Sequence, residues 1–222
     1  MRKLFEIGGL VAAAVLIAFG AVSIALGVNG HSTVGKELKQ QYIVGTPDMT
    51  PAAIKGEAAK AGLKNIALPT CTVAGKTVTS GARARCFAQY MRIHTLEATG
   101  GLTYAQMGRY QALPTAPKSA TDGRGGTSDP KYAATSPTTK QPVDNGLRNL
   151  WVTETALTTA LNASYMASQL ALFGIVVGVA LLLAGIGFAI LAIGGALRNP
   201  DTALPFYAKR NAKQTGPSPI PV

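Results

Sequence analysis

Two long uncharged apolar runs constrain this chain more than any other feature of its sequence. Residues 7–28 form the first run, IGGLVAAAVLIAFGAVSIALGV, and residues 170–197 form the second, LALFGIVVGVALLLAGIGFAILAIGGAL. A helix needs roughly 20 apolar residues to cross a hydrocarbon core about 30 Å thick, so both runs are long enough. Only 14% of the 222 residues are charged, against about a quarter in soluble domains. The sequence therefore predicts two transmembrane helices.

The residues around these runs predict the orientation of the chain. Signal-peptide cores of about 7–15 residues end at a small-x-small cleavage site, whereas the first run is longer and is followed by ALGVNGHS, so we expect an uncleaved signal anchor. Lys and Arg stand before the first run and after the second, in the list Arg2, Lys3, Arg198, Lys209, Arg210 and Lys213. Short basic flanks stay in the cytoplasm, and long loops are nearly exempt from this rule. We expect a protein of the cytoplasmic membrane with both termini in the cytoplasm.

The predicted organisation follows from these two spans. The segments are a cytoplasmic N-terminus (1–6), transmembrane helix 1 (7–28), an extracytoplasmic helical region (29–112), a flexible Pro/Gly/Ser/Thr-rich loop (113–143), a membrane-proximal helix (144–169) continuous with transmembrane helix 2 (170–197), and a cytoplasmic tail (198–222). The fold class expected is mainly α: an antiparallel hairpin of two transmembrane helices with a helical, disulfide-stapled region outside, residues 29–169.

Helix signals recur in the outer region. In TPDMTPAAIKGEAAKAGL, Thr50 is a candidate cap, Pro51 suits the first helical position and Gly62 suits the end. The stretch ARARCFAQYMRIHTLEATGG has its apolar residues on one face at helical spacing, with Gly100 as a stop signal. We expect a further short helix from Thr103, in TYAQMGRYQAL.

The last helix is expected to be the longest. Asp144 is the candidate cap, and no Pro or Gly lies between Leu147 and Phe173. Apolar residues recur there at roughly helical spacing, which predicts one helix from about Leu147 to Leu197.

Small residues predict how the two spans meet. Stripes of Gly and Ala let transmembrane helices approach closely. Pairing within the chain is the leading interpretation, and homodimerisation through the same stripes is the alternative. The helix-packing residues are Gly9, Ala13, Gly20 and Gly27 on the first span and Gly174, Gly178 and Gly185 on the second.

The two cysteines, Cys71 and Cys86, are predicted to form a structural disulfide. Cysteines that face an oxidising compartment normally pair. A structural zinc site needs four Cys or His ligands, and the spacing differs from the C-x-x-C of a redox motif. Metal and redox roles remain as minor alternatives.

Few side chains suggest catalysis. His94 and Glu97 are three residues apart on one predicted helix and form a candidate acid–base or metal pair, although a lone pair makes an incomplete site. The glycine-rich DGRGGTSDP follows no strand and opens no helix, which excludes a nucleotide loop. The basic residues are scattered without interleaved aromatics, so no nucleic-acid partner is expected. Anionic lipid or wall polymers are more suitable partners than nucleic acid for the net charge of +11.

Several stretches resemble an uncharacterised family of actinobacterial membrane proteins. They are MRKLFEIGG, QYIVGTPDMTPAAI, ARCFAQYMRIHTLEATGGLTYAQMGRY, NGLRNLWVTETALTTALN and FGIVVGVALLLAGIGF. The resemblance implies a two-span architecture and no established activity. Similar proteins have been labelled aromatic ring-opening dioxygenases.

The dioxygenase label conflicts with the residues available. A non-haem iron site needs two His and a carboxylate, so the only two histidines, His31 and His94, would both have to be ligands. The sequence favours a non-enzymatic integral membrane protein, without cofactor or metal, that binds membrane lipid and a membrane-protein or cell-envelope partner, or its own copies. Two alternatives are an accessory subunit of a transporter or respiratory complex and a metal-dependent enzyme.

Overall fold

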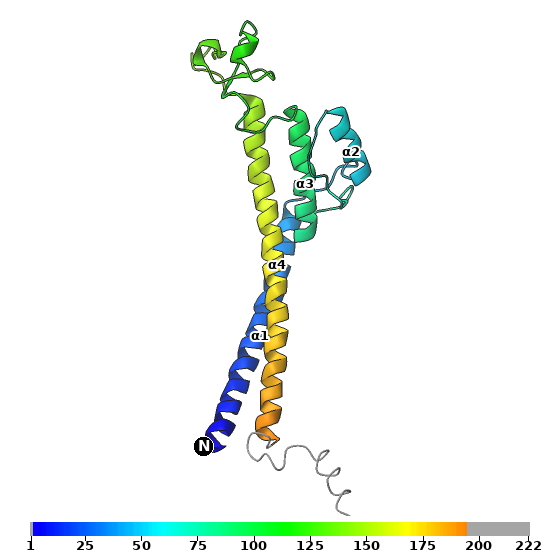
Figure 1. Ribbon diagram of the computed structural model, residues 1–222, viewed down its shortest axis with the longest axis vertical. Coiled ribbons are helices and arrows are strands. Elements are labelled where there is room, and N and C mark those ends of the chain that lie inside the picture. The colour runs from blue at the N-terminus through cyan, green and yellow to red at the C-terminus, as the bar shows by residue number, and fades with distance from the viewer. Residues whose placement is uncertain (1, 195–222) are drawn as a thin grey trace, which may run out of the picture. The chain divides into compact units, whose positions relative to one another are not determined.

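The chain is mainly α-helical, as predicted, in a computed structural model that describes residues 2–194 (Figure 1). Its α-helices are α1 (Arg2–Gln40), α2 (Pro51–Lys60), α3 (Gly81–Ala98) and α4 (Gly146–Ile193). The shorter elements are the strands β1 (Tyr110–Gln111) and β2 (Gly126–Thr127) and the 3-10 helices η1 (Lys118–Ala120) and η2 (Pro130–Tyr132). The predicted cytoplasmic tail and the last three residues of the second apolar run lie outside the described residues.

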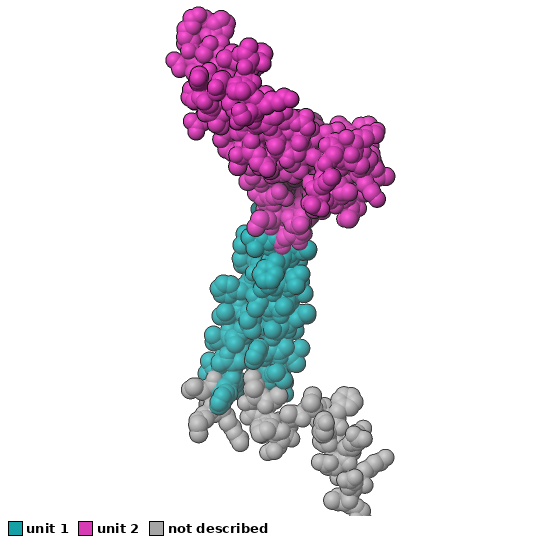
Figure 2. Space-filling view, turned by 45° about the horizontal axis from the view of Figure 1, so that its top comes forward, with its two compact units in different colours: residues 1–30, 170–222 teal, residues 31–169 magenta. Residues whose placement is uncertain are grey.

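The chain divides into two compact units (Figure 2). Unit 1 comprises residues 1–30 and 170–222, and unit 2 comprises residues 31–169. Two helices, α1 and α4, are long and apolar enough to span a membrane. Each of these helices contributes residues to both units, because neither is interrupted where its apolar run meets its polar part.

In unit 1, α1 and α4 pack against each other in antiparallel fashion. A Cβ added at Gly20 would lie 2.7 Å from the carbonyl oxygen of Gly178, and one added at Gly185 would lie 3.0 Å from that of Ala13. Residue numbers rise along α1 as they fall along α4, which defines the antiparallel direction. Backbones approach this closely only where no side chain separates them.

The packing faces of unit 1 repeat every seven residues. The buried small residues in this register are Ala13, Gly20 and Gly27 on α1 and Gly178, Gly185 and Ala192 on α4. A seven-residue repeat keeps one seam of a helix facing its partner over several turns. Of the remaining predicted stripe residues, Gly9 is buried and Gly174 is half-buried.

The helix α1 continues well past its apolar run, a feature that the sequence analysis did not predict. Its last residues, NGHSTVGKELKQ, include only two apolar side chains, Val34 and Leu38. These two apolar residues are four apart and therefore share a helix face. Leu38 is buried in the core of unit 2, with Val34 packed against that core.

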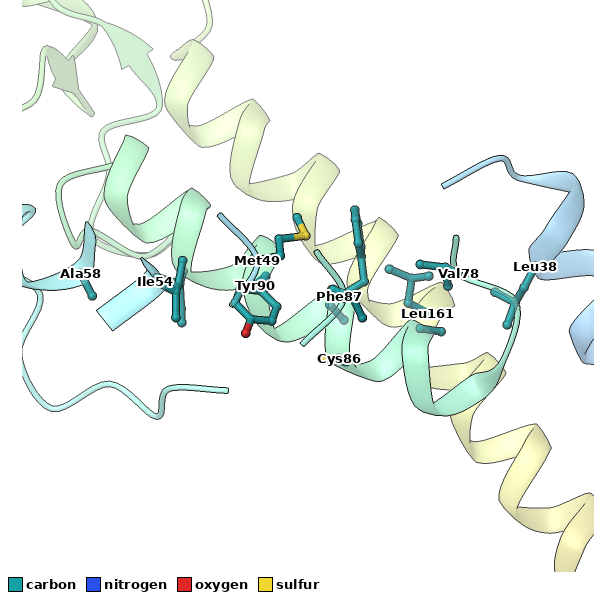
Figure 3. Packing of buried hydrophobic residues seen from close by; sticks show 13 residues of the cluster. Leu38, Met49, Ile54, Ala58, Val78, Cys86, Phe87, Tyr90 and Leu161 are labelled. Atoms are coloured by element: carbon teal, nitrogen blue, oxygen red, sulfur yellow. The ribbon is translucent and has the colours of Figure 1, made fainter. Parts of the chain in front are cut away.

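The hydrophobic core of unit 2 lies around α3 (Figure 3). Helices α1, α2 and α4 and the loops 41–50 and 63–80 all contribute side chains to this core. Its buried residues are Leu38, Met49, Ile54, Ala58, Val73, Val78, Ala84, Cys86, Phe87, Ala88, Tyr90, Ile93 and Leu161. The amphipathic helix predicted for residues 82–101 is confirmed, and Cys86, Phe87 and Tyr90 of its predicted apolar face are buried, whereas Ala98 is exposed and Thr95, expected on the polar face, is buried.

The predicted cap of α2 is confirmed. The Thr50 side chain accepts a hydrogen bond from the Ala53 amide, and Pro51 is the first helical residue. Gly62 follows the helix with a φ of +70°, a conformation that costs glycine little.

The boundaries of α3 and α4 agree partly with the predictions. At the end of α3, Gly100 has a φ of +64°, as its predicted role as a stop requires.

The predicted cap of α4 is wrong by one residue, because Asn145 and not Asp144 accepts the Leu147 amide through its side chain, at 3.0 Å. Asn145 also donates to the Gly108 carbonyl at 2.8 Å, and this second contact fixes which residue is the cap.

The helix predicted from Thr103 is wrong. Residues 104–106 form a turn, 107–109 are irregular, and Tyr110 and Gln111 form strand β1, which pairs with β2. A Cβ added at Gly108 would lie 2.1 Å from the Thr127 amide nitrogen, so the two backbones meet at this glycine. This long-range approach overrides the local helical preference.

The Pro/Gly-rich segment, residues 113–143, contains no α-helix and is held by hydrogen bonds within itself and to residues 108–112. The carboxylate of Asp122 accepts the backbone amides of Gly108, Arg124 and Gly126, each at 2.8 Å. Its irregular character agrees with the prediction, and its flexibility stays a prediction.

Candidate functional site

The disulfide predicted between Cys71 and Cys86 is present, with the two Cα atoms 6.1 Å apart. Cys86 lies in the first two turns of α3 and is buried, and Cys71 lies on the preceding loop. The bond therefore holds this loop against the N-terminal half of α3. The described chain contains no free cysteine.

A buried tyrosine strengthens the same attachment. Tyr90, one turn after Cys86, is fully buried and donates a hydrogen bond from its hydroxyl to the Cys71 carbonyl at 2.6 Å. Burial raises the pKa of the Tyr90 hydroxyl above its ordinary value of 10.0, because the phenolate is disfavoured away from water. The loop is thus held by a covalent bond and by a hydrogen bond.

The candidate pair of His94 and Glu97 does not form, in keeping with the incomplete site that the sequence offered. Glu97 is exposed. His94 Nε2 instead lies 2.8 Å from Asp48 Oδ2 and 3.7 Å from Glu57 Oε2. One potential ligand atom from each of these three residues lies within 4.8 Å of the other two. We call Asp48, Glu57 and His94 the His94 cluster.

Three separate segments build the His94 cluster. Asp48 lies on a turn closed by the hydrogen bond from the Met49 amide to the Thr46 carbonyl, Glu57 on α2 and His94 on α3. The pKa of Asp48 lies below its ordinary value of 3.8, first because the Thr46 side chain donates a hydrogen bond to it and also because His94 is close, while burial opposes the shift.

Sequence reasoning found one member of this cluster and missed two. Asp48 and Glu57 are far from His94 along the chain, and neither belongs to a spacing motif with it. His31, the other histidine, is an exposed residue of α1 and takes no part. The described residues therefore assemble one His with two carboxylates, and not the two-His, one-carboxylate set that the dioxygenase label requires.

A second feature of unit 2 is a row of arginines stacked on aromatic rings along α4. The guanidinium carbon of Arg92 lies 4.7 Å from the centre of the Trp151 ring, and Arg148 lies 4.0 Å from that of Tyr104. Arg92 Nε also lies 3.2 Å from Glu154 Oε1, whose side chain is 1% exposed. Arg92 and Arg148, two of the basic residues of the outer region, therefore make contacts with aromatic or acidic side chains of the same unit.

An open apolar hollow adjoins these stacked pairs. Its volume is about 560 Å³, and Val152 on its wall is 51% exposed. The lining residues are Tyr104, Trp151, Val152, Thr155, Ala156 and Thr159, all except Tyr104 from α4. We call this feature the α4 hollow; it has apolar walls with Arg and aromatic residues beside them, residue types that are enriched in protein interfaces.

Comparisons of the chain with protein-family models, with curated proteins and with solved structures find no match.

Proposed function

We propose that this chain is an integral membrane protein that acts by binding, through the extracytoplasmic region 29–169, a membrane-protein or cell-envelope partner. The spans are α1 and α4, both termini are cytoplasmic, and lipid surrounds the two apolar runs. The resemblance to the uncharacterised two-span family belongs to the same proposal.

The exposure of the two helices supports the membrane assignment. Only 17% of the most apolar stretch of each helix is buried, whereas the core helix of a soluble protein would be mostly buried. Large apolar side chains such as Phe19, Phe173 and Leu183 are each more than 60% exposed. Exposed apolar surface on this scale is stable when lipid covers it.

The disulfide supports the orientation. Disulfides persist in oxidising compartments and are rare in the cytosol. The bond joins Cys71 and Cys86, both in the region between the spans, and the short basic flanks 2–3 and 198–213 stand on the other side of each span in the sequence. These two observations are independent and favour the same orientation.

The observation that carries the binding role is the α4 hollow. An isolated exposed apolar residue needs no explanation, but contiguous apolar walls rimmed by polar groups are typical of interaction sites. Trp, Tyr and Arg, which dominate binding energy in protein interfaces, all occur at or beside this hollow.

Site-specific photo-crosslinking in intact cells tests this role. A photoreactive residue is placed at Val152, inside the hollow, and in a matched protein at Thr153, which is exposed but does not line it. We expect one major adduct from position 152 and little from 153, and mass spectrometry identifies the partner. Equal labelling from both positions, or labelling by lipid alone, would refute a protein partner at this site.

A further inference from the structure

We propose that Asp48, Glu57 and His94 form a binding site for a divalent transition-metal ion, with Zn²⁺ as the appropriate probe. This inference is independent of the proposed binding partner and of the orientation in the membrane. It rests on the convergence of three ligand atoms from a turn, from α2 and from α3.

The spacing of the ligand atoms suits one ion. Zn²⁺ binds His nitrogen and carboxylate oxygen at about 2.0–2.2 Å, so two ligand atoms on one ion are at most about 4 Å apart. His94 Nε2 lies 2.8 Å from Asp48 Oδ2 and 3.7 Å from Glu57 Oε2. No pair in the cluster is more than 4.8 Å apart, so a small side-chain rotation of the carboxylates completes the geometry.

The imidazole nitrogen in the cluster lacks another partner. His94 Nε2 is buried, and the two carboxylate oxygens beside it are Asp48 Oδ2, at 2.8 Å, and Glu57 Oε2, at 3.7 Å. The lone pair of a neutral imidazole and two carboxylate oxygens would converge there and repel one another. A positive charge between these three atoms, such as a bound cation, removes the repulsion.

The charge of the cluster suits a divalent cation. Within residues 2–194, neither Asp48 nor Glu57 forms an ion pair with Lys or Arg, although the region 29–169 carries 15 basic and 8 acidic residues. One divalent ion would neutralise the charges of both carboxylates.

The exposure of the cluster leaves room for an ion to enter and to keep a water ligand. The side chains of His94, Asp48 and Glu57 are 25%, 32% and 31% exposed, respectively. Imidazole suits Zn²⁺ and related transition metals, and carboxylates are acceptable to the same ions. Three protein ligands with one open position are typical of zinc sites that bind a further small molecule.

The test uses the full chain, purified in detergent with an affinity tag that contains no histidine and treated with a chelator. Calorimetric titration with Zn²⁺ measures the stoichiometry and Kd, and titration with Co²⁺ reports inner-sphere ligands through its visible absorption. We expect one ion per chain and a Tm that rises by several degrees when Zn²⁺ is in excess, because the ion binds the folded state.

Matched variants identify the ligands. Asp48→Asn, Glu57→Gln and His94→Gln should each weaken Zn²⁺ binding by at least about tenfold, since even residues that only support ligands have effects of this size. Glu97→Gln on the same helix and His31→Gln should bind like the unmodified chain. If the unmodified chain binds no stoichiometric Zn²⁺ up to millimolar concentration, or if His94→Gln binds equally well, the metal site is refuted and the cluster is an ion pair only.

Discussion

At the scale of single residues, the attachment of loop 63–80 to α3 depends on a few atoms. Cys71 takes part in both bonds that hold it, the disulfide through its sulfur and the hydrogen bond to Tyr90 through its carbonyl. Because Tyr90 and Cys86 are one helical turn apart on the buried face of α3, the two bonds act on the same point of the loop.

Tyr90→Phe isolates the contribution of the hydroxyl. The change leaves the Cys71 carbonyl without this donor, and we expect a loss of about 1–2 kcal/mol of stability at neutral pH. The single tryptophan, Trp151, reports unfolding of unit 2 by fluorescence in denaturant. An unchanged midpoint would show that the hydrogen bond contributes nothing net.

The same variant tests the raised pKa of Tyr90. A folded-state pKa above the unfolded value of 10.0 gives stability that is present below pH 10 and is lost as pH rises from there through the folded pKa. The unmodified chain should therefore lose stability more steeply than Tyr90→Phe above pH 10. Parallel curves for the two proteins would contradict this assignment.

Removing the disulfide should lower the free energy of unfolding more than removing the hydrogen bond does. Cys71→Ser combined with Cys86→Ser frees a loop with a sequence separation of 15, and loop-closure entropy predicts a loss of about 3 kcal/mol. Denaturant unfolding followed by Trp151 fluorescence measures this loss. Reductant should lower the free energy of unfolding of the unmodified chain by the same amount and leave that of the double variant unchanged.

At the scale of elements, the antiparallel pairing of α1 and α4 in unit 1 depends on the absence of side chains. A Cβ at Gly178 would lie 2.8 Å from the Gly20 carbonyl oxygen, which belongs to the backbone and cannot rotate away. Overpacking of this kind forces the helices apart and loses contacts along the whole seam.

Gly178→Leu should therefore destabilise the helix pair by about 1–3 kcal/mol or more. The matched control is Val179→Leu, since Val179 is 43% exposed and lies off the seam. Thermal unfolding in detergent, followed by circular dichroism, should show a lower Tm for the first variant and little change for the second. Equal Tm values would mean that the seam does not stabilise the pair.

The Pro/Gly-rich segment of unit 2 depends on Asp122 in a comparable way. Its carboxylate accepts three amides, and hydrogen bonds to charged groups contribute about 1.5–3 kcal/mol each. Asp122→Ala should accelerate hydrogen exchange at Gly108, Arg124 and Gly126 by more than tenfold. Asp129→Ala is the control, because the Asp129 carboxylate accepts only the Lys131 amide in this segment and its removal should leave the other three amides protected.

At the scale of the whole molecule, the proposed topology makes a prediction that labelling tests directly. In the background of Cys71→Ser and Cys86→Ser, Thr138→Cys, an exposed site between the spans, should react with an impermeant maleimide in intact cells. Thr202→Cys, in the tail, should react only after permeabilisation. The reverse pattern would invert the orientation and remove the argument that the disulfide faces an oxidising compartment.

The features predicted from sequence are those whose causes are local or periodic. Thr50 caps α2 because its side chain meets an amide three residues away, and the glycine stripes follow from a repeat along single helices. The disulfide was predictable because the chain has only two cysteines and the topology predicted from the sequence places both in one compartment. None of these inferences requires knowledge of which segments pack together.

Tertiary structure alone decided the contacts between distant segments. His94 meets Asp48 and Glu57, and not Glu97, because α2 and its preceding turn pack on α3. Likewise, the Asn145 side chain contacts Gly108, and β1 replaces the helix expected from Thr103 because its backbone meets Thr127. Apolar periodicity shows which face of a helix is buried, but it contains no information about which polar groups of another segment that face will meet, since those positions follow from the packing of the whole core.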